Sequence, residues 1–251
     1  MAYGFRRYVP VRERRGNAER ETARMREKGE PAQPVRITGR LIACTFWGKA
    51  WCDHLESFSD FENRLPRGRT YVRNGSVCHL EVVRGEVRAK VQGNELYTVT
   101  ITIDPLAKAA WKNIKRQCTG RISSLLDLLQ GRLSNGVMEV VTDREQGMFP
   151  RPGEIRLSCT CPDWAVMCKH VAAVLYGVGA RLDERPELLF LLRGVDHQEL
   201  VDAHAETAVR EAVHGGSGRR IADKDIAEIF GIDTTPEPKT RKGGRTQPRK
   251  P

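Results

Sequence analysis

The chain has 251 residues, of which 39% are hydrophobic and seven are cysteine, and its net charge is +10. This length allows one large or two modest domains, and no apolar run approaches the roughly 18 residues that a membrane-spanning helix needs. Seven cysteines do not make a disulfide scaffold and the N-terminus lacks the apolar stretch of a secretion signal. We therefore expect a cytoplasmic protein without a membrane partner.

Positive charge is concentrated at the two ends of the chain. Residues 1–40 contain eleven Lys and Arg against five Glu, and residues 236–251 contain six against one. The region between them, 41–235, has 25 basic and 26 acidic residues. Such ends suit a polyanion, DNA or RNA, but solvated tails have the same composition. The sequence predicts a disordered basic arm over residues 1–35 and a disordered basic tail over 236–251.

The first element predicted after the arm is a helix over residues 47–64. Trp51, Leu55 and Phe58 follow helical spacing, and Trp47 lies one turn before Trp51. An aromatic pair of this kind can stack on bases. In a protein with 6% aromatic residues it more often packs in the core, which is the interpretation we favour.

Residues 69–104 have the pattern of an antiparallel sheet. Polar and apolar residues alternate in four short runs, most clearly between Tyr97 and Ile103, and Gly-containing turn signals separate the runs. We predict four strands, the first at Arg69–Asn74. Two short helices should follow, one beginning at Pro105 and one over residues 122–130.

Four metal-binding side chains then lie close together in the segment LSCTCPDWAVMCKH: Cys159, Cys161, Cys168 and His170. Three thiolates and one neutral imidazole form a complete tetrahedral shell for zinc, with no open position for water or substrate. The sequence therefore predicts one structural Zn²⁺, whose removal should unfold this segment. Ordinary buried cysteines or a redox pair are the alternatives, although Cys-x-Cys is not the usual redox spacing.

The local pattern shows how the four ligands could converge. Cys159 and Cys161 are two residues apart on a predicted strand, so both sulfurs point to the same face, and Pro162 ends that strand. Apolar residues recur at helical spacing from Val171 to Val178. Cys168 must lie at or just before the first turn of this helix, where the partial positive charge also favours its thiolate.

No second site is expected. Cys44, Cys52, Cys78 and His79 have spacings that fit no common zinc pattern. The chain contains no Walker-type glycine-rich loop, no Gly-x-Ser-x-Gly and no His-Glu-x-x-His. We therefore expect a protein that is not an enzyme, although scattered carboxylates leave a nuclease open.

The pattern Cys-x-Cys-x₆-Cys-x-His, with Pro-Asp-Trp after the second Cys, resembles a SWIM-type zinc finger. The resemblance implies a strand pair and a helix around one zinc, with ligands Cys159, Cys161, Cys168 and His170, and a role in binding DNA or protein. The segments TFWGKAWCDHLE and GVGARLDERPELLFLLRGVD extend the likeness to bacterial stand-alone SWIM proteins over roughly residues 41–233. That group implies a Swi/Snf-type helicase as partner.

The fold class expected is α+β: an antiparallel four-stranded sheet with helices, then a zinc-stapled strand–turn–helix finger and a helical C-terminal region. The expected function is an adaptor in DNA transactions; the alternative is direct nucleic-acid binding through the finger and the basic tails. The expected divisions are 1–35 (arm), 36–150 (α+β domain), 151–182 (SWIM-type finger), 183–214 (C-terminal helices), 215–235 (linker and short helix) and 236–251 (tail).

Overall fold

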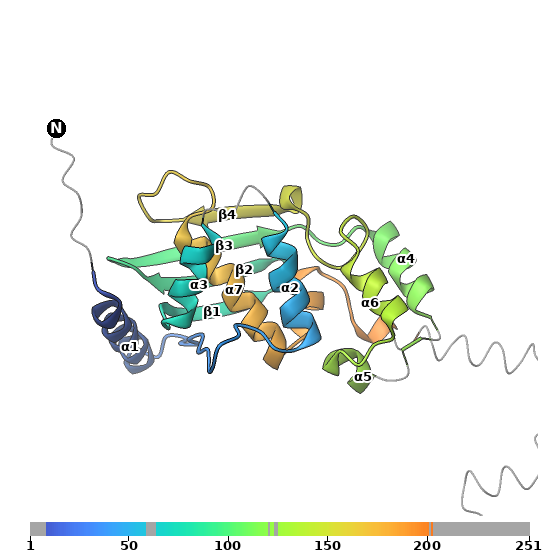
Figure 1. The fold of residues 1–251 in the computed structure, drawn as a ribbon, viewed down its shortest axis with the longest axis horizontal. Coiled ribbons are helices and arrows are strands. Elements are labelled where there is room, and N and C mark those ends of the chain that lie inside the picture. Colours follow the sequence, from blue (N-terminus) through green and yellow to red (C-terminus); the bar gives the residue numbers. More distant parts are fainter. Residues whose placement is uncertain (1–8, 59–63, 120, 123–124, 201, 203–251) are drawn as a thin grey trace, which may run out of the picture. The chain divides into compact units, whose positions relative to one another are not determined.

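The computed structural model describes residues 9–58, 64–119, 121–122, 125–200 and 202, which fall in the first of two units of the chain, Met1–Val209. The linker and short helix expected over 215–235 and the tail over 236–251 lie outside the described residues. The elements, drawn in Figure 1, are α1 (Val11–Glu27), α2 (Phe46–Glu56), α3 (Leu65–Arg73), β1 (Val77–Val83), β2 (Glu86–Gln92), β3 (Leu96–Ile103), α4 (Lys108–Cys118), α5 (Leu125–Gln130), α6 (Asn135–Thr142), β4 (Ile155–Cys159), α7 (Lys169–Glu184) and α8 (Glu187–Leu192).

The sheet has the order β1-β2-β3-β4, and every neighbouring pair is antiparallel. β1, β2 and β3 form a meander, and β4 returns from far along the chain to pair with β3, with Cys159 opposite Val99. The predicted α+β class and four-stranded antiparallel sheet are confirmed. Because β4 belongs to the expected finger, the finger shares a sheet with the expected α+β domain 36–150.

One predicted strand is wrong. Arg69–Asn74 is the end of α3 and its cap, because the buried residues of this segment, Leu65, Gly68, Tyr71 and Val72, recur at helical spacing. The Asn74-Gly75 pair does not form a hairpin turn. Gly75 has φ 67° and ends the helix in the left-handed conformation that glycine adopts without strain.

Helix α7 forms a middle layer between the sheet and the pair α2 and α3 (Figure 1). Every residue from His170 to Gly179 is buried. Trp47 and Trp51 of α2 are fully buried, and the Trp51 indole N–H donates to the Leu175 carbonyl of α7 at 2.8 Å. The core interpretation of this aromatic pair is therefore confirmed.

The disordered arm expected over residues 1–35 is contradicted over Val11–Glu27, which form helix α1 beside β1 and β2. Its buried stripe contains Ala18, Thr22 and Met25. The fourth buried residue of α1 is Arg14. Because two of the four buried residues are polar, the sequence of α1 shows little hydrophobic periodicity, and the helix could not be recognised from it. After α1, the Val35 amide donates to the Val77 carbonyl at 3.1 Å, so this segment covers the edge of β1.

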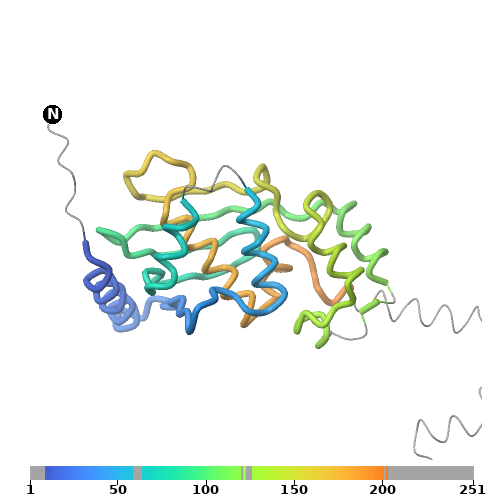
Figure 2. The backbone as a smooth tube through the Cα atoms, viewed as in Figure 1, coloured from blue at the N-terminus to red at the C-terminus, as the bar shows by residue number. Residues whose placement is uncertain are grey.

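The remaining helices differ from expectation mainly at their ends. α2 stops at Glu56 rather than residue 64, and α4 begins at Lys108 rather than Pro105, because the Leu106 amide donates to the Arg193 carbonyl instead of entering a helix. Helix α6 was not predicted. In the described ranges, no helix is both long and apolar enough to cross a membrane. Figure 2 follows the whole path as a continuous tube.

Candidate metal centre

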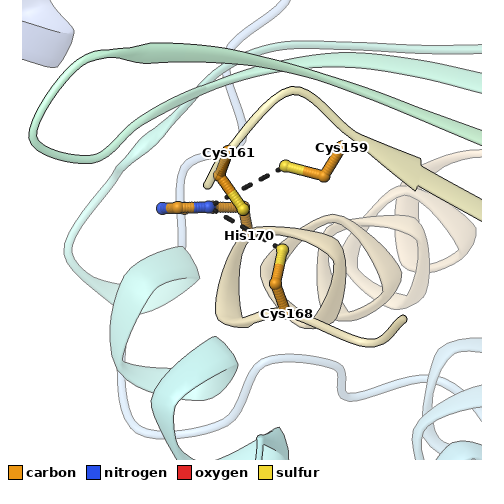
Figure 3. Close-up of side chains that lie close together, drawn as sticks. All are labelled: Cys159, Cys161, Cys168 and His170. Carbon is orange, nitrogen blue, oxygen red and sulfur yellow. Dashed lines mark hydrogen bonds between the residues drawn. The ribbon is translucent and has the colours of Figure 1, made fainter. Parts of the chain in front are cut away.

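The four predicted ligands come together at one end of α7. Their donor atoms, three Sγ atoms and a ring nitrogen of His170, all lie within 4.8 Å of one another (Figure 3). Cys168 and His170 are buried, and Cys159 and Cys161 are half-buried. The group is formed by the end of β4, the loop after it and the first turn of α7.

Secondary structure explains the convergence. Cys159 is the last residue of β4, and Cys161 follows two residues later, so both sulfurs point toward α7. The register of this end is held by the Thr160 amide, which donates to the Thr98 carbonyl at 3.1 Å. Cys168 is the N-cap of α7 in an extended conformation, with φ −84° and ψ 169°. This confirms that Cys168 precedes the first turn, which allows it and His170 to face the same point.

The distances fit one tetrahedral ion. Nδ1 of His170 lies 3.9 Å from Sγ of Cys159 and 3.8 Å from Sγ of Cys168. With Zn–S bonds of about 2.3 Å and Zn–N bonds of about 2.0–2.1 Å, the edges of a zinc tetrahedron are about 3.5–3.8 Å long. The group Cys159, Cys161, Cys168 and His170 therefore fits a single zinc ion, as predicted.

The thiols compete for a negative charge when no cation neutralises them. The hydrogen bond from Cys159 lowers the pKa of Cys168 to about 3, and the same contact together with burial raises the pKa of Cys159. Burial also raises the pKa of Cys161. Packing the three thiols together therefore opposes ionisation of all three at once. A bound divalent cation removes this conflict, because thiolates are its ligands.

The imidazole of His170 is enclosed by residues that sequence reasoning did not connect with the metal. Its ring centroid lies 4.5 Å from that of Tyr97, and the edge-on ring of Tyr71 lies at 5.3 Å. The other ring nitrogen, Nε2, is buried and has no hydrogen-bond partner among the described residues. A Cβ atom on Gly93 would lie only 2.7 Å from this Nε2. Gly93 has a φ outside the positive range, so glycine is needed here for space and not for its conformational freedom.

The loop between the second and third cysteines is tied to α3. The Asp163 carboxylate pairs with the Arg64 guanidinium at 3.2 Å and accepts from the Ala165 amide at 3.3 Å. Met167 is buried beside Cys168. The side chains of Trp164 and Val166 instead point to solvent, with 92% and 75% of their surfaces exposed. The loop is therefore fixed at Asp163 and Met167, and it exposes two large apolar side chains to solvent.

The other cysteines do not join a second site. In the part of the chain that the structure describes, the four finger residues are the one group of three or more His, Cys, Asp or Glu placed to share an ion. Burial raises the pKa of Cys52 to about 12 and those of Cys78 and Cys118 to about 11, as expected for thiols packed in a core. Cys44 is exposed.

Comparison with known proteins agrees with this geometry. The model of the SWIM zinc finger matches residues 144–178, which contain all four ligands. The uncharacterized protein Rv2102 of Mycobacterium tuberculosis is 34% identical over 187 residues, a match that covers 72% of this chain and 67% of the relative. No solved structure matches. The chain is a SWIM zinc-finger protein that belongs to the same family as Rv2102.

Proposed function

We propose that this protein is a non-enzymatic adaptor in DNA transactions that works with a Swi/Snf-type helicase. The observation that carries the proposal is the group of three cysteines and one histidine at the N-terminal end of α7, which can supply all four ligands of a zinc ion. A zinc ion with four protein ligands has no position left for water or substrate, so it organises a surface instead of activating a reactant. The helicase partner rests on the likeness of residues 41–233 to stand-alone SWIM proteins.

The surface of the finger is held rigid by its contacts with the rest of the fold. Its base is fixed by the sheet through β4, by the core through α7 and by α3 through the Arg64–Asp163 ion pair. A rigid surface loses little conformational entropy on association, which favours specific docking. This supports an adaptor whose metal has a structural role.

The test is affinity purification of the full chain from its own cells, followed by mass spectrometry, in wild type and in Cys161→Ser. Cys161 is half-buried at the rim of the group, so its replacement removes a ligand without opening a cavity in the core. We expect a Swi/Snf-type helicase with the wild type and its loss with the variant. A matched Cys44→Ser variant changes an exposed cysteine outside the group and should retain the helicase.

Two results would contradict the proposal. One is the absence of any helicase from wild-type purifications. The other is cleavage of nucleic acid by the pure protein that stops when a single carboxylate is changed, because that would make the protein a nuclease. Zinc content measured on each preparation separates loss of the partner from loss of the metal.

A further inference from the structure

Arg14 is a charged residue in the buried stripe of helix α1, with only 6% of its surface exposed. The ion pairs that α1 forms within the described chain belong to its exposed arginines, Arg15 and Arg24, and do not include Arg14. The Nε atom of Arg14 is also buried and has no hydrogen-bond partner among the described residues. Burial of an uncompensated charge is unfavourable, so the interactions that hold this guanidinium must lie inside the fold.

The guanidinium of Arg14 lies over the ring of Tyr71 in α3, 4.1 Å from the ring centroid. The same ring lies 5.3 Å from the imidazole ring of His170, at an interplanar angle of 72° that makes the contact edge-to-face. A cation over the face of an aromatic ring is attracted to it, which fixes the position of Tyr71 and, through it, one side of the imidazole. Arg14 therefore contacts a residue that in turn contacts a metal ligand.

The occupied metal centre carries a negative charge, because three thiolates outweigh one divalent cation. Cys168 and His170 are buried, so solvent screens this charge only weakly. A second cation, the ammonium of Lys169, lies 5.9 Å from the centroid of the same Tyr71 ring. The buried side chain of Arg14 has little room for an anion from solution, which favours the metal centre as its negative counterpart.

The other contacts of α1 bury little apolar surface. The helix lies beside β1 and β2 (Figure 1), and the apolar side chains of its buried stripe are those of Ala18 and Met25. The remaining buried residue, Thr22, donates its hydroxyl to the Ala18 carbonyl of its own helix at 2.8 Å. Because hydrophobic stabilisation scales with the apolar area buried, the contact of Arg14 with Tyr71 should contribute a substantial part of the docking of α1.

We propose that Arg14 is a positioning residue for the metal centre: it acts through Tyr71 on the imidazole of His170, so that docking of α1 and binding of zinc stabilise each other. Such coupling is reciprocal, because each event must change the equilibrium constant of the other by the same factor. Helix α1 lies outside residues 144–178, which match the SWIM zinc finger. The inference does not depend on the adaptor function or on a helicase.

Zinc affinity of the full-length protein, measured by competition with a chromogenic chelator, is the first test. Arg14→Met removes the charge but keeps an apolar stem, and we expect it to lower the affinity by about fivefold to tenfold. Arg14→Lys keeps a cation over the ring and should restore most of the loss. Arg12→Met is the matched control, because it removes the same charge from an exposed position on α1 and should leave the affinity unchanged.

A double-mutant cycle shows whether Arg14 acts through Tyr71. Tyr71→Leu removes the aromatic ring, and in that background Arg14→Met should lower zinc affinity much less than it does in the wild type. Tyr71→Phe keeps the ring and should retain the full effect of Arg14→Met. The effect should also persist in about 1 M salt, where the screening length is about 3 Å, because a buried contact is screened much less than surface charges are.

Amide hydrogen exchange of α1 tests the reciprocal effect. In the wild type, α1 should exchange more slowly with zinc than without it, and in Arg14→Met its exchange should no longer respond to the metal. Urea unfolding of the zinc-free proteins separates metal affinity from overall stability. A variant Arg14→Met that is less stable but binds zinc like the wild type would overturn the proposal. So would equal effects of Arg14→Met with and without the Tyr71 ring, or exchange of wild-type α1 that ignores zinc.

Discussion

The imidazole of His170 shows how residues outside the ligand set position a metal site. One nitrogen faces the sulfurs, while the rings of Tyr97 and Tyr71 fix the plane of the imidazole. Metal-bound histidines usually donate their second N–H to a polar partner. Here the second nitrogen lies against Gly93 and has no polar partner within the described ranges of the chain. The imidazole is therefore oriented by its packing against Tyr97, Tyr71 and Gly93 and not by a hydrogen bond to its second nitrogen.

Gly93→Ala should therefore damage the metal site without touching a ligand. The added Cβ would lie 2.7 Å from Nε2 of His170 and 2.7 Å from the ring of Tyr97, closer than such atoms can approach. Overpacking of this kind costs about 1–3 kcal/mol. We expect zinc affinity to fall by about tenfold or more, measured by competition with a chromogenic chelator.

The control is Gly153→Ala, because nothing lies within 4 Å of a Cβ at that position. It should bind zinc like the wild type. Equal affinity in both variants would show that the imidazole can move away from Gly93 at no cost.

A second residue links stability to pH. His54 of α2 is buried against Phe149, and its Nε2–H donates to the Pro150 carbonyl at 3.0 Å. Burial lowers the pKa of His54 and also that of His79. The unfolded chain therefore binds more protons than the folded one as pH falls below about 6.5, and the stability present above that pH is progressively lost.

Urea unfolding at about pH 7.5 and 5.5 should show this loss, and it should be smaller in His54→Gln, whose amide can donate to the same carbonyl without titrating. Zinc content must be followed at both pH values, because protonated ligands release metal. An identical pH dependence in wild type and variant would exclude His54 as a contributor.

At the scale of elements, helix α3 lies so close to α7 that only glycine fits at their contact. A Cβ on Gly68 would lie 2.5 Å from the Cβ of Ala172 and 2.8 Å from the Ala172 carbonyl carbon. This close approach brings Arg64, the N-cap of α3, to the finger loop and Tyr71, near the other end of the helix, to the imidazole.

Two glycine substitutions should consequently have opposite signs. Gly68→Ala should lower the free energy of unfolding by about 1–3 kcal/mol, because the backbone of α7 cannot yield. Gly16→Ala, in α1 with nothing within 4 Å of the added Cβ, should raise it by about 0.5–1 kcal/mol through helix propensity. Denaturant unfolding measures both. Stabilisation by both changes would mean that α3 and α7 can separate freely.

Elements were predictable where one kind of periodicity dominates. The alternation from Tyr97 to Ile103 gave β3, and the stripe after Val171 gave α7 with Cys168 at its start. The second half of α3 was mistaken for a strand because Arg69–Asn74 contains only two apolar residues, Tyr71 and Val72, too few to separate helical spacing from alternation. Which strand completes the sheet could not be predicted, since the pairing of β3 with β4 is a long-range contact. The four ligands were predictable because chemistry and short spacing are local, whereas Gly93 and Tyr71 reach His170 only through the fold.

At the scale of the whole described unit, the finger is continuous with the core. Cys159 ends a strand of the sheet, and His170 is the second residue of helix α7, in which the next nine residues are all buried. In an isolated zinc-finger peptide, metal binding supplies the entire free energy of folding. Here apolar burial along α7 supplies much of it, so the metal should control the loop and the first turn more than the helix as a whole.

Removal of zinc should therefore produce a graded response. We expect a strong chelator to lower the Tm, by about 2–4 °C for each kcal/mol of stability lost, while helical circular dichroism is largely kept at room temperature. Amide hydrogen exchange should accelerate from Thr160 to Met167 and stay slow along Val171–Leu182, because the buried face of α7 does not depend on the ion. An unchanged Tm would show that no stabilising metal was bound. Complete loss of helical signal would instead show that α7 depends on zinc for its fold, as it would in an independent finger.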